Sequence, residues 1–410
     1  MRRCLYVVAL AALVVGVCPV DGIADDDKEP RVKFSGDIRG RWEGFWFNED
    51  PTGNEKADRR RIRYRVRFDA KATINDHAKM ALRLGTGQID NRSGNQTLGE
   101  PVDFSPSAIT FRRAYLTFYP WAKGGLGSRD GHLSFHFGRV AIPFVWKNGK
   151  DIMLLDNDLN PNGLSVNFDI NMGESAMFFV NAGVFIIEEK SGEVDPNYSG
   201  VQAGVQNKFS DAFKAGIRGS WYYFSNLDTL FLQRGIDGEG GVTSAGGNIP
   251  GGLTGDPLGG RLNVWETQAF VNFGKSEKWP VTGFGGFSYN QDASETVFVE
   301  DSDTLAIDKE GIAYNAGIEF GNKKKTVLLG FAYFHIEANA FPSQFIDSDL
   351  LDGHTNRKGP FLYFKRQILK GTDFNVQLFR SAPIEENNVF VESVKNSKRT
   401  RIQVDLVYKF

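Results

Sequence analysis

The stretch "RRRIRYRVRFDAKATI", residues 59–74, has the clearest chemical potential in the chain. Arginine occupies every second position, at Arg61, Arg63, Arg65 and Arg67. Guanidinium groups are planar forks of N–H donors that match carboxylates and phosphates. A row of four therefore predicts a surface that attracts or binds anions.

The charge of the whole chain limits what those anions are. The sequence holds 48 Lys and Arg against 50 Asp and Glu, for a formal net charge of −2. A general nucleic-acid binder usually carries a strongly cationic domain. The composition therefore argues against a nucleic-acid partner, although a local basic patch stays open.

Metal and enzyme chemistry have weaker signals. The five histidines form no HExxH pair, and His132 and His136 would lie about 13 Å apart on a strand, too far for one zinc ion. Polar residues alternate from Asp156 to Asn162 as in a calcium loop, but Pro161 stands where the EF-hand pattern needs glycine. No serine lies in a nucleophile elbow. We expect no cofactor, no metal and no enzymatic activity; a surface calcium site and an outer-membrane hydrolase are the alternatives.

The spacing of the arginines indicates the element that carries them. Period two is the side-chain period of a β-strand, so all four guanidinium groups leave one face. Ile62, Tyr64, Val66 and Phe68 leave the other face. A strand with one cationic and one apolar face needs two different surroundings.

The N-terminus predicts export. Arg2 and Arg3 precede the apolar stretch "CLYVVALAALVVGV", and small residues up to Ala24 suit a signal peptidase. We predict a cleaved signal peptide at 1–24, a short periplasmic segment at 25–30 and a barrel at 31–410. A lipoprotein signal at Cys18 is the alternative.

The cysteines support a simple mature chain. Both of them, Cys4 and Cys18, lie in the predicted signal peptide. The mature chain then has no thiol, which excludes disulfides, cysteine metal sites and cysteine nucleophiles. Beyond the signal no stretch reaches the roughly 18 to 20 apolar residues of a membrane helix, so the chain is either soluble or a membrane β-barrel.

The C-terminal segment "KRTRIQVDLVYKF", residues 398–410, favours the barrel. Apolar residues alternate with polar ones, and the segment ends on Phe410. It resembles the last strand of bacterial outer-membrane barrels, in which a terminal aromatic residue serves as an assembly signal. The last strand of a soluble sandwich is the alternative.

Alternating segments recur along the whole chain. They predict an all-β transmembrane antiparallel up-and-down barrel of about 16 strands, with mostly short connectors after even-numbered strands and longer ones after odd-numbered strands. The predicted strands are 31–47, 57–74, 78–88, 109–119, 132–140, 164–172, 176–188, 199–209, 213–224, 261–273, 280–291, 310–320, 326–338, 359–369, 373–381 and 398–410.

The membrane decides which face of each strand looks inward. An arginine or lysine near the bilayer midplane costs roughly 2 to 4 kcal/mol, so the apolar face must meet lipid and the cationic face the lumen. The first and last strands add further cations at similar heights once the barrel closes. The predicted pore-lining basic residues are Arg39, Arg41, Arg61, Arg63, Arg65, Arg67, Lys71, Arg399 and Arg401.

The connector at 141–163 is too apolar for a water-exposed loop, so we expect it to fold inward as the third extracellular loop. Its carboxylates Asp151, Asp156 and Asp158 would then face the arginines across a constriction, as charged rings do in selective pores. Cation binding by these acids at the surface is the alternative.

The same region carries a family resemblance. "GRVAIPF" at 138–144, followed by "LLDNDLNPNGLSV" at 154–166, resembles the third-loop region of a family of bacterial outer-membrane porins. The resemblance implies a 16-stranded diffusion channel in the outer membrane whose third loop constricts the lumen. It also implies lipid and lipopolysaccharide as surroundings and a homotrimer, because general porins of this build are often trimers.

Three functions remain open from the sequence. The first is passive diffusion of small hydrophilic solutes and ions with a preference for anions. The second is a specific channel for an anionic nutrient, such as phosphate, a carboxylate or an acidic sugar. The third is a plugged barrel that acts as a surface receptor or a structural protein.

Overall fold

The structure is a computed structural model. The predicted signal peptide, the segment 25–30 and Asp151 lie outside the described residues. Those residues are 31–46, 48–49, 55–56, 58–87, 92–100, 106–120, 131–146, 154–192, 194–227, 236–237, 241–242, 260–274, 279–293, 296–300, 303–307, 309–321, 326–384 and 398–410.

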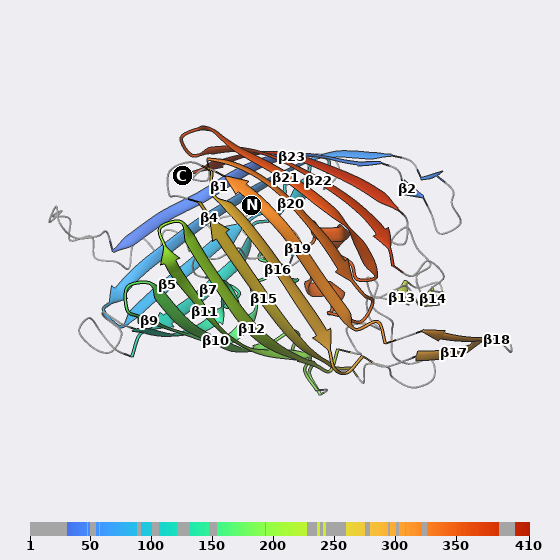
Figure 1. The fold of residues 1–410 in the computed structure, drawn as a ribbon, viewed down its shortest axis with the longest axis horizontal. Coiled ribbons are helices and arrows are strands. Elements are labelled where there is room, and N and C mark those ends of the chain that lie inside the picture. The colour runs from blue at the N-terminus through green and yellow to red at the C-terminus, as the bar shows by residue number, and fades with distance from the viewer. Residues whose placement is uncertain are drawn as a thin grey trace.

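Sixteen long strands form a closed antiparallel barrel (Figure 1). This confirms the predicted fold class and strand number, and each predicted strand end lies within three residues of the observed one. The barrel strands are β1 (Val32–Trp46), β4 (Arg59–Asn75), β5 (Ala78–Gly85), β7 (Thr110–Phe118), β8 (Gly131–Arg139), β9 (Asn162–Met172), β10 (Ala176–Ile186), β11 (Asn197–Ser210), β12 (Phe213–Ser225), β15 (Leu262–Phe273), β16 (Val281–Asn290), β19 (Ile312–Gly321), β20 (Val327–Ile336), β21 (Arg357–Leu369), β22 (Thr372–Pro383) and β23 (Arg399–Lys409).

The first and last strands close the barrel. β1 pairs with β4 on one side and with β23 on the other, so Arg41 stands opposite Arg63 and also opposite Asp405. The remaining barrel strands pair with their neighbours in chain order. Among the described strands this pairing closes the sheet on itself, which satisfies the backbone hydrogen-bonding groups within the membrane.

The outer face is apolar, as a lipid environment requires. Phe34 and Ile38 on β1 point outward and are 57% and 48% exposed. Arg39, the next residue after Ile38, points inward and is 9% exposed. The same alternation places Ile62 of β4 outside and Arg65 inside. The period-two pattern of the sequence therefore separates a lipid face from a lumen face.

Shorter elements belong to the connectors. The strands β2 and β3, β13 and β14, and β17 and β18 form small hairpins at the end of the barrel with the long connectors (Figure 1). Among the described residues no helix is long and apolar enough to cross a membrane. These elements are β2 (Asn48–Glu49), β3 (Glu55–Lys56), β6 (Gln96–Thr97), β13 (Ile236–Asp237), β14 (Gly241–Val242), β17 (Thr296–Glu300), β18 (Asp303–Ile307), and the 3-10 helices η1 (Ser343–Phe345) and η2 (Leu350–Gly353).

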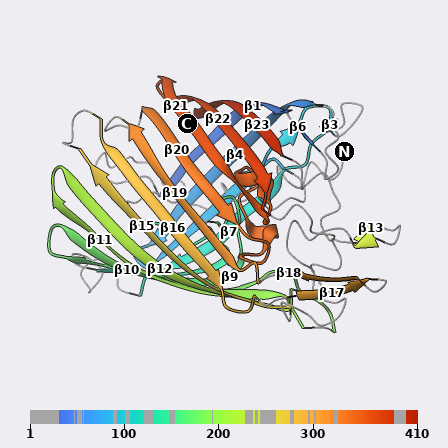
Figure 2. The same ribbon diagram turned by 45° about the vertical axis from the view of Figure 1, so that its right-hand side comes forward.

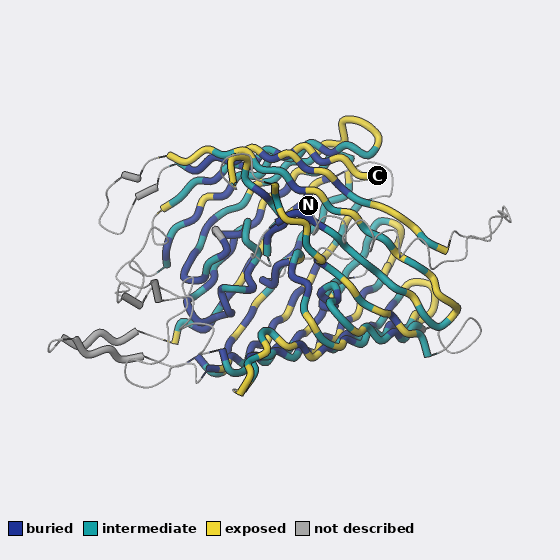
Figure 3. The backbone as a smooth tube through the Cα atoms, turned by 180° about the vertical axis from the view of Figure 1, so that it is seen from behind, coloured by how far each residue is buried: buried dark blue, intermediate teal, exposed yellow. Residues whose placement is uncertain are grey.

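Buried residues concentrate towards the end of the barrel with the long connectors (Figure 3). There the lumen faces of several strands are apolar: Phe334 and Ile336 of β20 are at most 2% exposed. Connector segments cover these faces from inside, and η1 and η2 lie within the outline of the barrel in two views (Figures 1 and 2). This explains why segments such as 326–338 alternate poorly, because both of their faces meet apolar surroundings.

Candidate functional site

The arginine wall is the cationic part of the lumen surface on three adjacent strands. The register of β1 and β4 sets Arg39 opposite Arg65 and Arg41 opposite Arg63. Across the closure, Arg401 of β23 stands opposite Phe45 and donates to Glu43 of β1. The wall consists of Arg39, Arg41, Arg61, Arg63, Arg65, Arg67 and Arg401.

Three carboxylates from the same strands neutralise part of the wall. Asp37 accepts hydrogen bonds from Arg65 at 2.9 Å and from Arg67 at 2.6 Å. Asp405 binds Arg41 in a two-pronged contact, with Nε to Oδ1 at 2.7 Å and Nη2 to Oδ2 at 2.9 Å. Such paired contacts fix the guanidinium plane as well as its charge.

Glu43 lies between two further arginines. It is fully buried, and it pairs with Arg61 of β4 and with Arg401 of β23. Gln403 also donates to its Oε1 at 2.9 Å. A buried carboxylate with three donors stabilises the close approach of like charges that would otherwise repel across a sheet.

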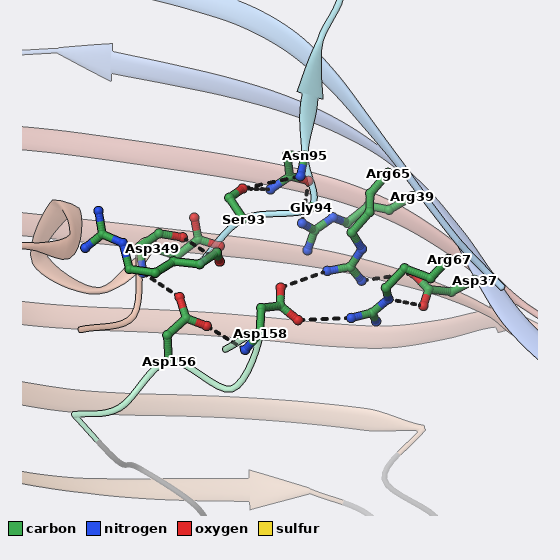
Figure 4. A network of polar contacts seen from close by, with 12 residues as sticks. Asp37, Arg39, Arg65, Arg67, Ser93, Gly94, Asn95, Asp156, Asp158 and Asp349 are labelled. Atoms are coloured by element: carbon green, nitrogen blue, oxygen red, sulfur yellow. Dashed lines mark hydrogen bonds and ion pairs between the residues drawn. The ribbon is translucent and has the colours of Figure 1, made fainter. Parts of the chain in front are cut away.

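Asp158 reaches the wall from the connector between β8 and β9. Its two carboxylate oxygens lie 3.5 Å from Arg65 and 3.1 Å from Arg67 (Figure 4). Asp158 is therefore one predicted loop carboxylate that faces predicted pore-lining arginines. Asp37 holds the same two arginines from the strand side, so each guanidinium is shared between a strand acid and a loop acid.

Asp349 is a second loop carboxylate on the wall, and the sequence interpretation missed it. It lies between η1 and η2 in the connector from β20 to β21, and its oxygens are 2.8 Å from Arg41 and 2.9 Å from Arg401. Although burial by itself raises the pKa of Asp349, the charges of Arg41 and Arg401 hold that pKa well below its usual value. Asp349 is therefore ionised at neutral pH.

The connector 337–356 is fixed in the lumen by a third segment. Arg92 donates from Nη1 to the carbonyl oxygens of Ser343 at 2.8 Å and Gly353 at 2.9 Å. Close by, Asn95 accepts a hydrogen bond from Arg39 of the wall. One short stretch after β5 thus contacts both the inserted connector and the wall.

The described parts of 141–163 pack against lumen-facing side chains. Trp146 contacts the ring of Phe270 with centroids 4.9 Å apart, and Phe144 contacts Tyr222 at 5.2 Å. Gly216 leaves room for this packing, since a Cβ there would lie 3.0 Å from the Trp146 ring. Residues 147–153 of this connector lie outside the described residues.

Two connectors meet each other inside the barrel. Leu155 forms a β-bridge with Ile346, and the Asp156 backbone N–H donates to Phe345 at 2.8 Å. We call 140–146, 154–161 and 337–356 together the inserted segments. Their apolar side chains belong to the buried hydrophobic cluster of the described chain.

The side chain of Asp156 does not contact the arginine wall, contrary to the prediction that it faces the arginines. Its carboxylate accepts backbone N–H bonds from Asp158 at 2.7 Å and Ser348 at 3.0 Å instead. Burial, and then the neighbouring charges of Asp347 and Asp158, raise the pKa of Asp156 to about 9. Asp156 therefore shapes the junction of the inserted segments, because its short side chain caps backbone groups there.

Two other predicted basic residues lie away from the centre of the wall. Lys71 is exposed near the end of β4, opposite Lys33 of β1. Arg399 lies at the start of β23 with its guanidinium 5.2 Å from the centre of the Phe45 ring. Neither joins the ion pairs described above, although Arg399 is in contact with Phe45.

A cavity of about 380 Å³ adjoins the wall. Arg39, Arg65 and Arg67 line one side, and Lys365, Asn375 and Gln377 from β21 and β22 line another. The described residues contain no cluster of three or more metal-ligating side chains. The cavity is lined by basic and acidic side chains together with two amides.

Comparison with known proteins gives the fold a context. Residues 46–235 match a protein family described as "Putative porin". OprB of Pseudomonas putida, in its high-pH structure, is similar with a TM-score of 0.54 and 11% identity, over 92% of this chain and 94% of that one. OmpF of Salmonella typhi, solved in complex with daunomycin, gives a TM-score of 0.52 and 12% identity, over 95% and 99%. No curated protein matches the sequence.

The family match and the fold agree with the lipid face and the polar lumen. Both support a channel of the bacterial outer membrane. The resemblance in 138–166 lies within the matched segment. The chain is thus a 16-stranded β-barrel with the fold of outer-membrane porins, and its residues 46–235 match a family described as "Putative porin".

Proposed function

We propose that the protein forms a water-filled channel for passive diffusion of small hydrophilic solutes and ions, with a preference for anions. The arginine wall would set this preference, because charged rings at a constriction raise the local concentration of counter-ions. The inserted segments would supply the constriction.

The charge balance of the wall carries the proposal. Within the described part of the chain, seven arginines lie within 4.0 Å of only five carboxylates: Asp37, Glu43, Asp158, Asp349 and Asp405. The wall therefore keeps a formal surplus of two positive charges. In a narrow lumen with low-dielectric walls such a surplus favours anions over cations.

The position of the inserted segments supports a route along the wall. Their apolar side chains pack against β10, β11, β12 and β15, which bear Phe179, Tyr198, Tyr222 and Phe270. These contacts support a lumen that is filled on that side. The cavity beside Arg39 and Arg67 lies on the other side, so a passing ion would move past guanidinium groups.

The surroundings are part of the same proposal. The apolar outer face fits outer-membrane lipid, with lipopolysaccharide in the outer leaflet, and a homotrimer is the expected assembly. Small hydrophilic or anionic solutes are the proposed cargo.

A plugged barrel that serves as a receptor is the second candidate, because the inserted segments bury an apolar cluster in the lumen. Swelling of liposomes that contain the purified protein separates the two. A channel admits arabinose and glucose faster than the larger raffinose, with rates that fall with solute size. Rates equal to those of protein-free liposomes for every sugar would refute diffusion and favour the plugged barrel.

A further inference from the structure

The cavity beside the arginine wall has the size and the lining of a binding site. Its volume of about 380 Å³ falls in the range of roughly 300 to 1,000 Å³ that is usual for small-molecule pockets. Its lining includes six basic side chains and three carboxylates. Ligand pockets use a few converging polar groups of this kind to fix the orientation of a small molecule.

Arg39 is the cation in this lining with the weakest ion pairing. Its nearest carboxylate oxygen is Oδ2 of Asp405 at 3.9 Å, and Asp405 already binds Arg41 through both oxygens. The Arg39 side chain is 11% exposed, and its Nε is buried without a hydrogen-bond partner among the described residues. A nearly buried guanidinium without a close counter-ion favours an anion from the cavity.

The lining also offers uncharged hydrogen-bonding groups. Asn375 and Gln377 lie on the lumen face of β22, and within the described part of the chain neither side chain makes a hydrogen bond. Tyr363 of β21 lines the same cavity and donates its hydroxyl to Glu319. The two amides can each donate to and accept from the hydroxyl groups of a solute.

The neighbouring acids limit the charge of that solute. Asp349 and Asp405 lie close to Arg39 along the wall, and Asp373 lines the cavity, where it pairs with Lys365 at 3.0 Å and Lys409 at 2.8 Å. A doubly charged phosphate at Arg39 would meet more repulsion from these acids than a single carboxylate. The wall itself shows that carboxylates fit its guanidinium groups. Asp405 accepts a hydrogen bond from Arg41, and Asp37 accepts one from Arg65.

We propose that this cavity is a binding site for a singly charged, hydroxylated carboxylate, the chemical class of the sugar acids. Arg39 binds the carboxylate, and Asn375 and Gln377 bind hydroxyl groups of the body. The inference rests on the proposed channel and adds a saturable step to it. A channel that prefers anions without such a site remains compatible with the proposed function alone.

The test is inhibition of the chloride current in planar bilayers by D-glucuronate, with D-glucose and acetate as controls. D-glucose has the hydroxyl groups without the charge, and acetate has the charge without the hydroxyl groups. We expect D-glucuronate to reduce the current saturably, with a half-blocking concentration at least tenfold below that of either control. Inorganic phosphate should block less strongly than D-glucuronate.

Three variants separate the parts of the site. Arg39→Gln should raise the half-blocking concentration of D-glucuronate about tenfold or more, because a charged hydrogen bond is lost. Arg39→Lys should keep the ion selectivity of the channel, because the charge remains. It should weaken the block by D-glucuronate, because the fork geometry of the guanidinium group is lost. Gln377→Ala should raise the half-blocking concentration of D-glucuronate about two- to tenfold and leave that of acetate unchanged.

The matched control is Arg60→Gln, which removes a charge from an exposed side chain on the outer face. Heat-dependent gel mobility confirms that each variant is a folded barrel. Equal block by D-glucuronate and D-glucose, block by phosphate as strong as by D-glucuronate, or no effect of either Arg39 variant would overturn the inference. An anion-selective current that persists in that case leaves the proposed function standing, whereas absence of current refutes both.

Discussion

Neutralisation of two central arginines should remove the anion preference. We consider the double variant Arg63→Gln and Arg65→Gln, which takes away the formal surplus of two charges on the arginine wall. Glutamine is preferable to glutamate here, because a carboxylate at position 65 would lie against Asp37 and Asp158. The variant therefore changes the field without placing like charges together.

The magnitude follows from Coulomb's law. A unit charge about 7 Å from an ion in water contributes roughly 0.6 kcal/mol at a dielectric constant of about 80. Screening at about 0.1 M salt, where the Debye length is about 10 Å, reduces this by about half. Two charges then stabilise chloride by about 0.6 kcal/mol and destabilise potassium equally, so their loss lowers the chloride-to-potassium permeability ratio about eightfold.

The assay is the reversal potential of single channels under a potassium chloride gradient. The control Arg60→Gln with Arg366→Gln makes the same change in net charge at exposed positions outside the lumen. It should leave the reversal potential unchanged. If the Arg63 and Arg65 variant behaves like this control while it folds and conducts, the wall does not border the conducting path.

Further perturbations probe the inserted segments. Asp158→Asn removes a carboxylate from Arg65 and Arg67, so the reversal potential should move towards greater chloride preference. Trp146→Ala should weaken the docking of its segment by about 3 to 5 kcal/mol, the usual cost of such a truncation, and protease cleavage between 140 and 161 should accelerate while the barrel stays folded. Burial and neighbouring acids raise the pKa of Asp156 from 3.8 to about 9, so docking of the segments should weaken as pH rises through this window. Asp156→Asn should make the cleavage rate nearly independent of pH between about 7 and 9, whereas Asp347, whose pKa burial raises to about 6, still contributes below this range.

Much of the barrel could be predicted because its physics is local. Period-two alternation distinguishes lipid from lumen at each strand, and the cost of a charge in lipid fixes which face is which. Those two rules placed Arg39 and Arg65 on the lumen face, and the register of β1 and β4 sets them opposite each other. The alternation failed in β20, where Phe334 faces an apolar lumen.

The parts missed from the sequence depend on contacts between distant segments. The signal that marked 141–163 as an inward connector, too many apolar residues for a loop, is also present in 337–356, where Phe341, Ile346 and Leu351 are buried. Applied there, it would have indicated the second insertion. That Asp349 then reaches Arg41, 308 residues earlier in the chain, depends on the closed barrel and could not be deduced from spacing.

The roles of the loop acids show the same limit. Asp156 and Asp158 are two residues apart, and the sequence treats them alike. The β-bridge between Leu155 and Ile346 turns Asp156 to the backbone of the other connector and leaves Asp158 on the arginines. Only the packing of two connectors distinguishes a structural carboxylate from one that faces the wall.

The reversal potential of the unmodified protein, in a planar bilayer under a potassium chloride gradient, tests the central claim most directly. The surplus of arginine over carboxylate predicts steady conductance with chloride more permeant than potassium. A preference for potassium would show that the carboxylates of the lumen, Asp158 and Asp349 among them, control the path, and it would contradict the account.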